Sequence, residues 1–292
     1  FNNQNPYIPG SDQGYHLGTL PAMFEPLIMF NVITGEHENW LAETWEYNQD
    51  HTVITMTLRQ GIEWSDGHPL TTKDVAFTFE LLKQNAGSMV HLADLPEFFD
   101  STQVIDERTF RLVLNQPGPA FWASTLSSSH GVHILPEHIW KDVDPLEFTN
   151  HDIEAGLPLG TGPYQLVYAS PYQKIYDLRK DWWAARTGFQ RLPRVERIIY
   201  VPQQDESQAA RVLVTDQSDM GFIMQVLTLE RVLERNDQIM TFTEREPPYG
   251  YLDWCPIDLS LNCSAAPFDN PQIRQAISLA VDRDKLVGLA ES

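Results

Sequence analysis

The sequence predicts an α/β protein in which mixed β-sheets are flanked by helices. Hydrophobic residues make up 42% of its 292 residues, a composition typical of a globular chain with a buried core. Several short segments alternate apolar and polar residues with the period of a half-buried strand, and others carry apolar residues at helical spacing behind a capping residue. The length corresponds to about two domains of ordinary size.

The first part of the chain is predicted to contain a strand, a helix and one apolar segment of either kind. Residues 1–40 are rich in loop formers, and the apolar run Phe24–Phe30 predicts a helix or a buried strand. The alternation in Val53–Leu58 predicts a strand. A capping-box pattern at Thr71 to Asp74 precedes an apolar stripe, which predicts a helix from about Thr72 to Gln84.

Four further strands are predicted along the chain. Thr109–Leu114 alternates as a strand does, and Pro117 and Pro119 end it. Three more strands are predicted in the segments PYQLVYA, QKIYDLR and RIIYVP, which follow an irregular region over 128–160.

Three helices are predicted after these strands. Ser207 and Thr228 are the expected caps of two of them. Asn270 followed by Pro271 predicts the start of the third. Its expected apolar face consists of Ile273, Ala276, Ile277 and Ala280.

The charge balance narrows the class of partner. Forty acidic residues against twenty Lys and Arg give a formal charge of −20, which would repel a phosphate backbone and argues against a nucleic-acid partner. No apolar run reaches the roughly 18 to 20 residues that a bilayer-spanning helix needs. Phe1 is not followed by a signal-peptide pattern, so we expect a soluble chain that begins within a longer one.

Two cysteines, Cys255 and Cys263, lie eight positions apart. In an exported protein they could form a short local disulfide, whereas in a cytosolic protein they would be two unrelated buried thiols. One pair does not supply the four ligands of a structural zinc site.

The segment SSSHGVHILPEH is the most obvious candidate for metal chemistry. It contains His130, His133, Glu137 and His138, but their spacing does not match the zinc-peptidase motifs, and Pro136 interrupts the helix that would align them. Ordinary loop histidines, residues that line a ligand cavity and a metal site all remain open, and we predict no metal site.

The sequence gives no support for nucleophilic catalysis, and its aromatic residues are better candidates for contacts with a ligand. The sequence has no Gly-x-Ser-x-Gly nucleophile motif. Among its eight tryptophans, Trp122 follows a proline break in a loop that a ligand could reach. An indole ring there could stack on a sugar or an apolar side chain, or simply pack against the core.

Five segments, in order, resemble one known family. Residues 41–79 (LAETWEYNQDHTVITMTLRQGIEWSDGHPLTTKDVAFTF) closely resemble the signature of the family 5 extracellular solute-binding proteins. The other matches are FEPLIMFN (24–31), GTGPYQL (160–166), residues 181–220 and FDNPQIRQAISLAVDRDKL (268–286). Together they span nearly the whole chain.

The resemblance implies a periplasmic-binding-protein-like fold of type II, cluster C, with two lobes. The first domain would be split between residues 1–40 and 160–246, and the second would be inserted over 41–159. Residues 251–292 would open a third domain in the opposite lobe. Family members continue beyond this point, so we expect an N-terminal portion that lacks most of the third lobe.

The implied function is that of a receptor for an ATP-binding-cassette importer, which encloses a ligand between lobes and passes it to a membrane permease without a reaction. We favour an oligosaccharide of the cello-oligosaccharide type over a short peptide. Nickel or haem within the same family, and a cleft hydrolase outside it, are the alternatives. No cofactor is expected. The protein would be a periplasmic or extracellular monomer, with a lipid anchor as one means of attachment.

Family loop positions imply a set of ligand-binding residues in three loops. Trp122 belongs to the loop that follows the proline break. The full set is Gly14, Tyr15, His16, Ser88, His91, Trp122, Ser129 and His130. Export would also favour the disulfide between Cys255 and Cys263.

Overall fold

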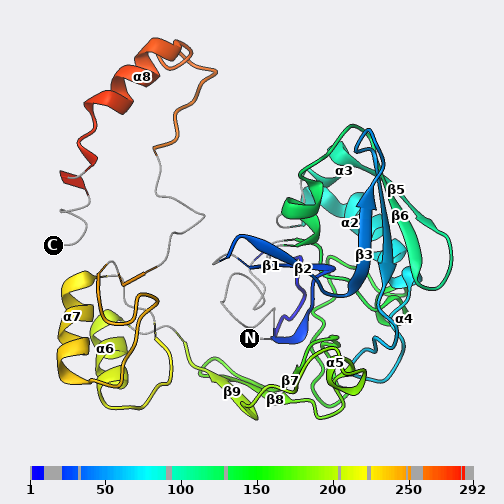
Figure 1. Cartoon of the computed structure of the whole chain (residues 1–292), viewed down its shortest axis with the longest axis horizontal. Helices are drawn as coiled ribbons and strands as arrows, with labels where there is room; N and C mark the ends of the chain where they lie inside the picture. The colour runs from blue at the N-terminus through cyan, green and yellow to red at the C-terminus, as the bar shows by residue number, and fades with distance from the viewer. Residues whose placement is uncertain are drawn as a thin grey trace. The chain divides into compact units, whose positions relative to one another are not determined.

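A computed structural model of the chain describes residues 2–9, 22–31, 34–89, 94–127, 131–202, 205–221, 225–247, 249–250, 259–283 and 285–286. The chain falls into two compact units, Phe1–Pro202 and Gln203–Ser292 (Figure 1). The boundary at Pro202 lies inside the segment 160–246 that the family resemblance assigns to the first domain, so the predicted three-domain division stays a prediction.

A four-stranded antiparallel sheet in the order β3-β4-β6-β5 forms the centre of the first unit. Its strands are β3 (Ala42–Tyr47), β4 (Val53–Leu58), β5 (Phe99–Val104) and β6 (Thr109–Leu114). The predicted strands over 53–58 and 109–114 are therefore confirmed. In β4 the side chains of Ile54, Met56 and Leu58 are fully buried while the alternate ones are half-buried, because successive side chains point to opposite faces of a sheet.

Helix α2 (Thr72–Asn85) covers the buried face of this sheet (Figure 1). Val75, Phe79 and Leu82 are fully buried in the same core as the sheet residues, and the ring of Phe79 lies 5.0 Å from that of Phe99 on β5. The capping box predicted at Thr71 and Asp74 is present. The helix therefore begins where the sequence predicted.

Two smaller sheets complete the first unit. Strands β1 (Ile28–Asn31) and β2 (Glu36–Asn39) form a hairpin, and β7 (Tyr164–Ala169), β8 (Lys174–Leu178) and β9 (Arg197–Tyr200) form an antiparallel sheet. The three strands predicted over 163–202 are thus confirmed. Their core also takes in residues from the start of the chain: Ala22, Met23 and Phe24 are buried with Tyr164, Leu166 and Tyr176.

Two glycines allow this N-terminal segment to approach so closely. A Cβ atom at Gly160 would lie 2.1 Å from the carbonyl oxygen of Met23, and one at Gly162 would lie 2.6 Å from that of Ala22. The N–H of Gly162 donates a hydrogen bond to the Met23 oxygen over 2.8 Å. The GTGP segment is therefore a point of backbone contact, at which only glycine fits.

Short helical segments connect these sheets. They are η1 (Ala86–Ser88), α3 (Leu95–Phe98), the π-helical turn η2 (Trp122–Leu126), α4 (Glu137–Trp140) and α5 (Trp183–Arg186). The region 128–160, expected to be irregular, contains α4 as its one helix among the described residues.

The second unit contains α6 (Glu206–Val214), α7 (Val226–Arg235) and α8 (Pro271–Ala280). Asn270 caps α8 as predicted. The caps expected at Ser207 and Thr228 are wrong, because α6 is capped by the side chain of Asp205, and α7 begins after Gln225.

The predicted apolar face of α8 is not buried in the described part of the second unit. No residue of α8 is buried, and Leu279 on the same helix is 80% exposed. The amphipathic spacing therefore predicted the helix correctly, but none of the described residues forms a core that buries its apolar face.

The mixed α/β class is confirmed, with one difference in the sheets. We expected mixed sheets, whereas every described strand pair is antiparallel. Strands β3 and β4, β5 and β6, and β7 and β8 follow each other through short turns, and such connections produce antiparallel neighbours. In the described part of the chain, no helix combines the length and the apolar character needed to cross a membrane.

Candidate functional site

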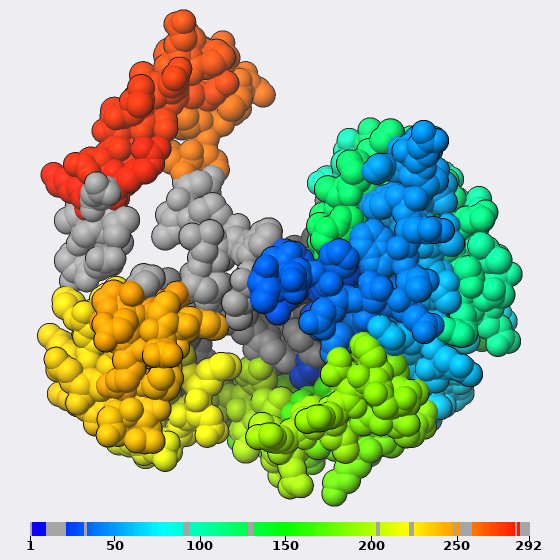
Figure 2. All heavy atoms as spheres, viewed as in Figure 1, coloured from blue at the N-terminus to red at the C-terminus, as the bar shows by residue number. Residues whose placement is uncertain are grey.

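Five rings gather where the β1–β2 hairpin meets β3 and η2, and we call them the aromatic platform: Phe30, His37, Trp45, Tyr47 and Trp122. The ring of Trp122 is the centre of the group, since it lies 5.1 Å from His37, 5.6 Å from Trp45 and 6.4 Å from Phe30. Tyr47 joins through Trp45 at 6.1 Å. The hairpin and the β3 region lie side by side on the face shown in Figure 2.

Strand geometry places four of these rings. Phe30 and His37 are direct partners in the β1–β2 hairpin, and directly opposite side chains share a face of an antiparallel pair. Trp45 and Tyr47 are two positions apart on β3, so they also share a face. The β1–β2 hairpin and strand β3 thus each contribute two aromatic side chains to the platform.

The fifth ring is placed by the proline break. The hydroxyl of Tyr47 donates to the carbonyl of Gly118 over 2.8 Å and accepts the N–H of Trp122 over 3.3 Å. Burial raises the pKa of this hydroxyl, which keeps it protonated and able to donate. Trp122 is the first residue of the π-helical turn η2. Such turns are rare in proteins overall, and many of those known lie at functional sites.

The platform is accessible and has polar edges. Phe30, Trp45, Tyr47 and Trp122 are half-buried and His37 is exposed. The indole N–H of Trp45 donates to the side chain of Asn39 over 3.0 Å, which fixes the ring. Flat apolar faces of this kind can stack on a sugar ring or on an apolar side chain.

The predicted site residues have three different outcomes. Trp122 lies in the platform. Ser88 is exposed at the end of η1, and no ring contact or hydrogen bond among the described residues joins it to the platform. The remaining six, Gly14, Tyr15, His16, His91, Ser129 and His130, lie outside the described residues, so their roles stay predictions.

The disulfide also stays a prediction. Cys263 is a free, exposed thiol, and its sulfur lies 3.4 Å from the carbonyl of Leu261. Cys255 lies outside the described residues.

Four platform residues were missed by sequence reasoning. The spacing of Trp45 and Tyr47 in a strand would have placed both on one face, but their proximity to Trp122 depends on the tertiary fold. His37 and Phe30 carry no local pattern that separates them from ordinary hairpin residues.

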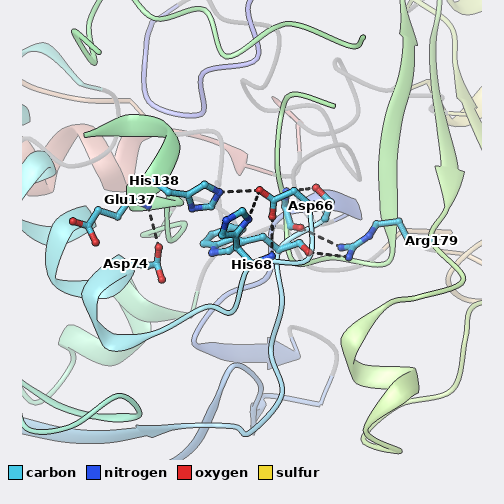
Figure 3. A network of polar contacts seen from close by, with 9 residues as sticks. Asp66, His68, Asp74, Glu137, His138 and Arg179 are labelled. Carbon is cyan, nitrogen blue, oxygen red and sulfur yellow. Dashed lines mark hydrogen bonds and ion pairs between the residues drawn. The ribbon is translucent and has the colours of Figure 1, made fainter. Parts of the chain in front are cut away.

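A second constellation, distinct from the platform, contains three potential metal ligands (Figure 3). One carboxylate oxygen of Asp66, Oδ2, lies 2.9 Å from Nδ1 of His68 and 2.8 Å from Nε2 of His138. The two imidazole rings are stacked with centroids 4.3 Å apart. Partial burial raises the pKa of Asp66, but hydrogen bonds from the His68 backbone and the His138 side chain outweigh it, and the net pKa is lowered.

Buried polar contacts hold the elements that carry this constellation. Asp74 of α2 accepts the N–H of Glu137 over 2.9 Å, which fixes the start of α4 and so His138. The guanidinium of Arg179 donates to the carbonyls of Gly160, Gly162 and Trp64 at 2.9 to 3.3 Å (Figure 3). The turn that follows Trp64 is thereby tied to the GTGP segment.

The two described histidines of the segment 130–138, His133 and His138, have different partners. His133 is buried, and its backbone N–H donates to the hydroxyl of Tyr7 over 2.7 Å. His138 joins Asp66 and His68 instead, and His130 lies outside the described residues. His68 was missed because its partner His138 is seventy positions away along the chain.

Two surface hollows lie away from the platform. One of about 380 Å³ is lined by residues of α2 and of the segment around the end of α4, and one of about 330 Å³ lies on the outer face of the central sheet. The only tryptophan in their linings, Trp140, is itself buried. Phe77 in the lining of the first hollow is half-buried, and the lining of the second contains no aromatic residue, whereas the platform groups five rings.

The comparisons with known proteins identify the family. Residues 36–291 match the model of the bacterial extracellular solute-binding proteins, family 5. Because this match covers most of the chain, the protein belongs to that family.

Relatives and solved structures of this family differ in ligand. The glutathione-binding protein GsiB of Pectobacterium atrosepticum is 25% identical over 257 residues, and that of Escherichia coli strain K12 is 26% identical over 256 residues. Each match covers 87% of this chain and 45% of the relative. The chain therefore spans about half the length of the curated relatives it matches.

Among solved structures, a mannohexaose-bound periplasmic oligopeptide-binding protein of Thermotoga maritima is 27% identical, with a TM-score of 0.72 over 91% of this chain and 47% of the other. The structure of NikZ from Campylobacter jejuni in complex with Ni(L-His) has a TM-score of 0.68 at 20% identity, over 92% of this chain and 49% of that one. At that identity the second likeness supports the fold alone.

Proposed function

We propose that this chain is part of an exported receptor of an ATP-binding-cassette importer, and that it binds an oligosaccharide through the aromatic platform. Membership of the extracellular solute-binding family supports the receptor class and an extracytoplasmic location. The observation that carries the ligand class is the cluster of half-exposed rings around Trp122. The receptor performs no reaction and delivers its ligand to a membrane permease.

The platform suits an uncharged ligand better than an anionic one. Its described rings offer apolar faces, and the formal charge of −20 would oppose an anion at long range. A pyranose ring presents an apolar face that can stack on indole, and its hydroxyls can reach polar edges such as Asn39. The mannohexaose bound by the Thermotoga maritima protein shows that this fold can hold such a ligand.

A short peptide is the second candidate. It is favoured by the matches to proteins named for glutathione binding. Peptide side chains can also pack on ring faces, while backbone groups would bind by strand-like hydrogen bonds. In either case closure by hinge motion requires ligand contacts to both lobes of the whole protein.

The test is a binding comparison with one platform variant and one control. The protein would be titrated by calorimetry with cello- and manno-oligosaccharides and with glutathione and tripeptides. Trp122→Ala removes the central ring, and we expect it to weaken oligosaccharide binding about tenfold or more. Tyr172→Ala is the matched control, because Tyr172 is an 81% exposed aromatic residue outside the platform.

Each outcome is informative. Oligosaccharide binding that Trp122→Ala leaves unchanged would contradict the platform as its site. Binding of peptides alone would replace the first candidate by the second. Mass spectrometry of the incubated ligands gives the class test, since cleavage products would show a hydrolase instead of a receptor.

A further inference from the structure

The constellation of Asp66, His68 and His138 has the donor atoms of a transition-metal site. Its three potential ligand atoms, Oδ2 of Asp66, Nδ1 of His68 and Nε2 of His138, all lie within 4.8 Å of one another. Two ligands each about 2.1 Å from a tetrahedral zinc ion are about 3.4 Å apart. The observed separations of 2.9 and 2.8 Å from Oδ2 to the two nitrogens are close to this spacing. Small side-chain rotations would admit an ion among the three atoms.

The backbone around these ligands is held in place on both sides. The other oxygen of Asp66 accepts the N–H of His68 over 3.1 Å, and the N–H of Trp64 donates to the carbonyl of His68 over 2.8 Å. These bonds close the turn that carries two ligands. The third ligand stands on α4, whose first N–H is bound by Asp74 of α2. The three donors are therefore brought together by the fold before any ion arrives, which lowers the cost of binding.

Donor chemistry selects the kind of ion. Two imidazole nitrogens and one carboxylate oxygen suit Zn²⁺, Ni²⁺ or Cu²⁺, whereas Ca²⁺ and Mg²⁺ prefer sites made of oxygen alone. Three protein ligands leave one position for water or an external group. Each neutral ring would carry its proton on the other nitrogen when it ligates. The side chain of His68 is 61% exposed, so solvent can reach the ring.

Electrostatics around the cluster also favour a cation. Asp66 supplies a negative charge, and Asp74 interacts electrostatically with His138. Arg179 is a cation that interacts electrostatically with Asp66, and its guanidinium is bound to three carbonyls outside the donor set. At the scale of the molecule, the charge of −20 raises the local concentration of cations.

We propose that Asp66, His68 and His138 form a Zn²⁺-binding site on the first unit, which links the turn after Trp64 to α4. The ion joins two residues of one turn to a helix that lies some seventy positions further along the chain. Because the ion binds the folded state, it stabilises the unit in proportion to its concentration over its dissociation constant. The site is separate from the aromatic platform, so it goes beyond the proposed receptor function and does not depend on it.

The first test measures stoichiometry and affinity. Untagged protein, freed of metal by a chelator, would be titrated with ZnCl₂ by calorimetry, and one ion per chain is expected. His68→Gln and His138→Gln should each weaken binding by about tenfold or more, because each removes one of three ligands. His51→Asn is the matched control, since His51 is a histidine outside the cluster whose φ of 57° asparagine also tolerates.

The second test reports coordination and stability. Co²⁺ in place of Zn²⁺ should give the visible absorption of a four-coordinate site in the parent protein and in His51→Asn, and lose it in His68→Gln. At a free Zn²⁺ concentration about tenfold above its dissociation constant, the Tm should rise by about 3 °C. His68→Gln should keep the metal-free Tm, since its side chain is mostly exposed.

Several results would overturn the proposal. They are the lack of saturable Zn²⁺ binding by the folded parent protein, binding that neither His68→Gln nor His138→Gln weakens, and binding that His51→Asn weakens equally. Trp122→Ala should retain full Zn²⁺ affinity, so failure of the oligosaccharide test and failure of the metal test are distinguishable.

Discussion

Glu25 is a buried carboxyl group held between two tryptophans. Its side chain accepts the indole N–H of Trp40 over 2.9 Å and that of Trp183 over 2.7 Å, and the residue is only 4% exposed. Burial raises the pKa of Glu25 to about 7, although hydrogen bonds from Trp183 and Trp40 act in the opposite direction. The desolvation of the charged form is the larger effect, as expected for a buried carboxylate.

This raised pKa makes stability depend on pH. In the unfolded chain Glu25 loses its proton near its ordinary pKa, while the folded protein holds the proton up to about pH 7. The folded state therefore binds more protons in this window, and the Glu25 contribution to stability decreases from about pH 4.5 to about pH 7 and is constant above. Glu25→Gln cannot ionise. We expect the free energy of unfolding to fall less steeply with pH in this variant than in the parent.

Urea denaturation at pH 5, 6, 7 and 8 would measure both proteins. In the variant, the amide N–H₂ group points toward one indole N–H, so two donors meet without an acceptor. This should reduce the free energy of unfolding by about 1–3 kcal/mol at every pH. The informative quantity is thus the difference between the two proteins as pH changes. Parallel pH profiles would show that Glu25 does not titrate in this range.

At the scale of single elements, α2 shows how far local patterns predict structure. The capping box and the apolar stripe are both encoded within a few residues, and the helix formed where they indicated. The strands over 53–58 and 109–114 followed from alternation for the same reason. The capping residue was harder to predict where several polar residues lie next to each other. At α6 the side chain of Asp205 accepts the N–H of Gln208, and the hydroxyl of Ser207 donates to Asp205 instead of capping the helix.

The candidate site could be predicted less well than the elements. Trp122 was identified from its loop context, but its ring partners come from three other strands, and pairings of that kind depend on packing. The same holds for His68 and His138, which lie seventy positions apart in the sequence and are brought together by tertiary contacts such as the hydrogen bond from Glu137 of α4 to Asp74 of α2. Local periodicity specifies which face a side chain occupies, and it does not specify which distant face it meets.

The double role of Asp74 leads to a prediction about α2. Thr71→Ala removes the side-chain acceptor for the N–H of Lys73 and should reduce stability by about 1 kcal/mol, as for other cap losses. Asp74→Ala removes the acceptor for the Thr71 N–H and also the one for Glu137. It should reduce stability by about 2–4 kcal/mol, because two backbone donors lose their partner. Urea denaturation of both variants checks this order, and equal losses would mean that the bond to Glu137 contributes nothing.

The whole molecule consists of two units that differ greatly in their cores. The first unit buries large side chains throughout its sheets and helices, including Trp64, Trp140, Trp183 and Phe79. In the described part of the second unit the buried hydrophobic residues are Leu213, Val232 and Leu233. The chain spans about half the length of the curated relatives it matches.

These cores predict that the two units fold with different autonomy. A protein of residues 1–202 should unfold in one cooperative urea transition, since its buried apolar surface can offset the conformational entropy of folding. A protein of residues 203–292 should lack such a transition, because a few buried side chains on α6 and α7 supply too little burial and α8 buries none. Circular dichroism of both fragments across a urea series is the measurement. A cooperative transition of 203–292 alone would show that this segment has a core of its own, and a featureless profile of 1–202 would show that the first unit requires the second.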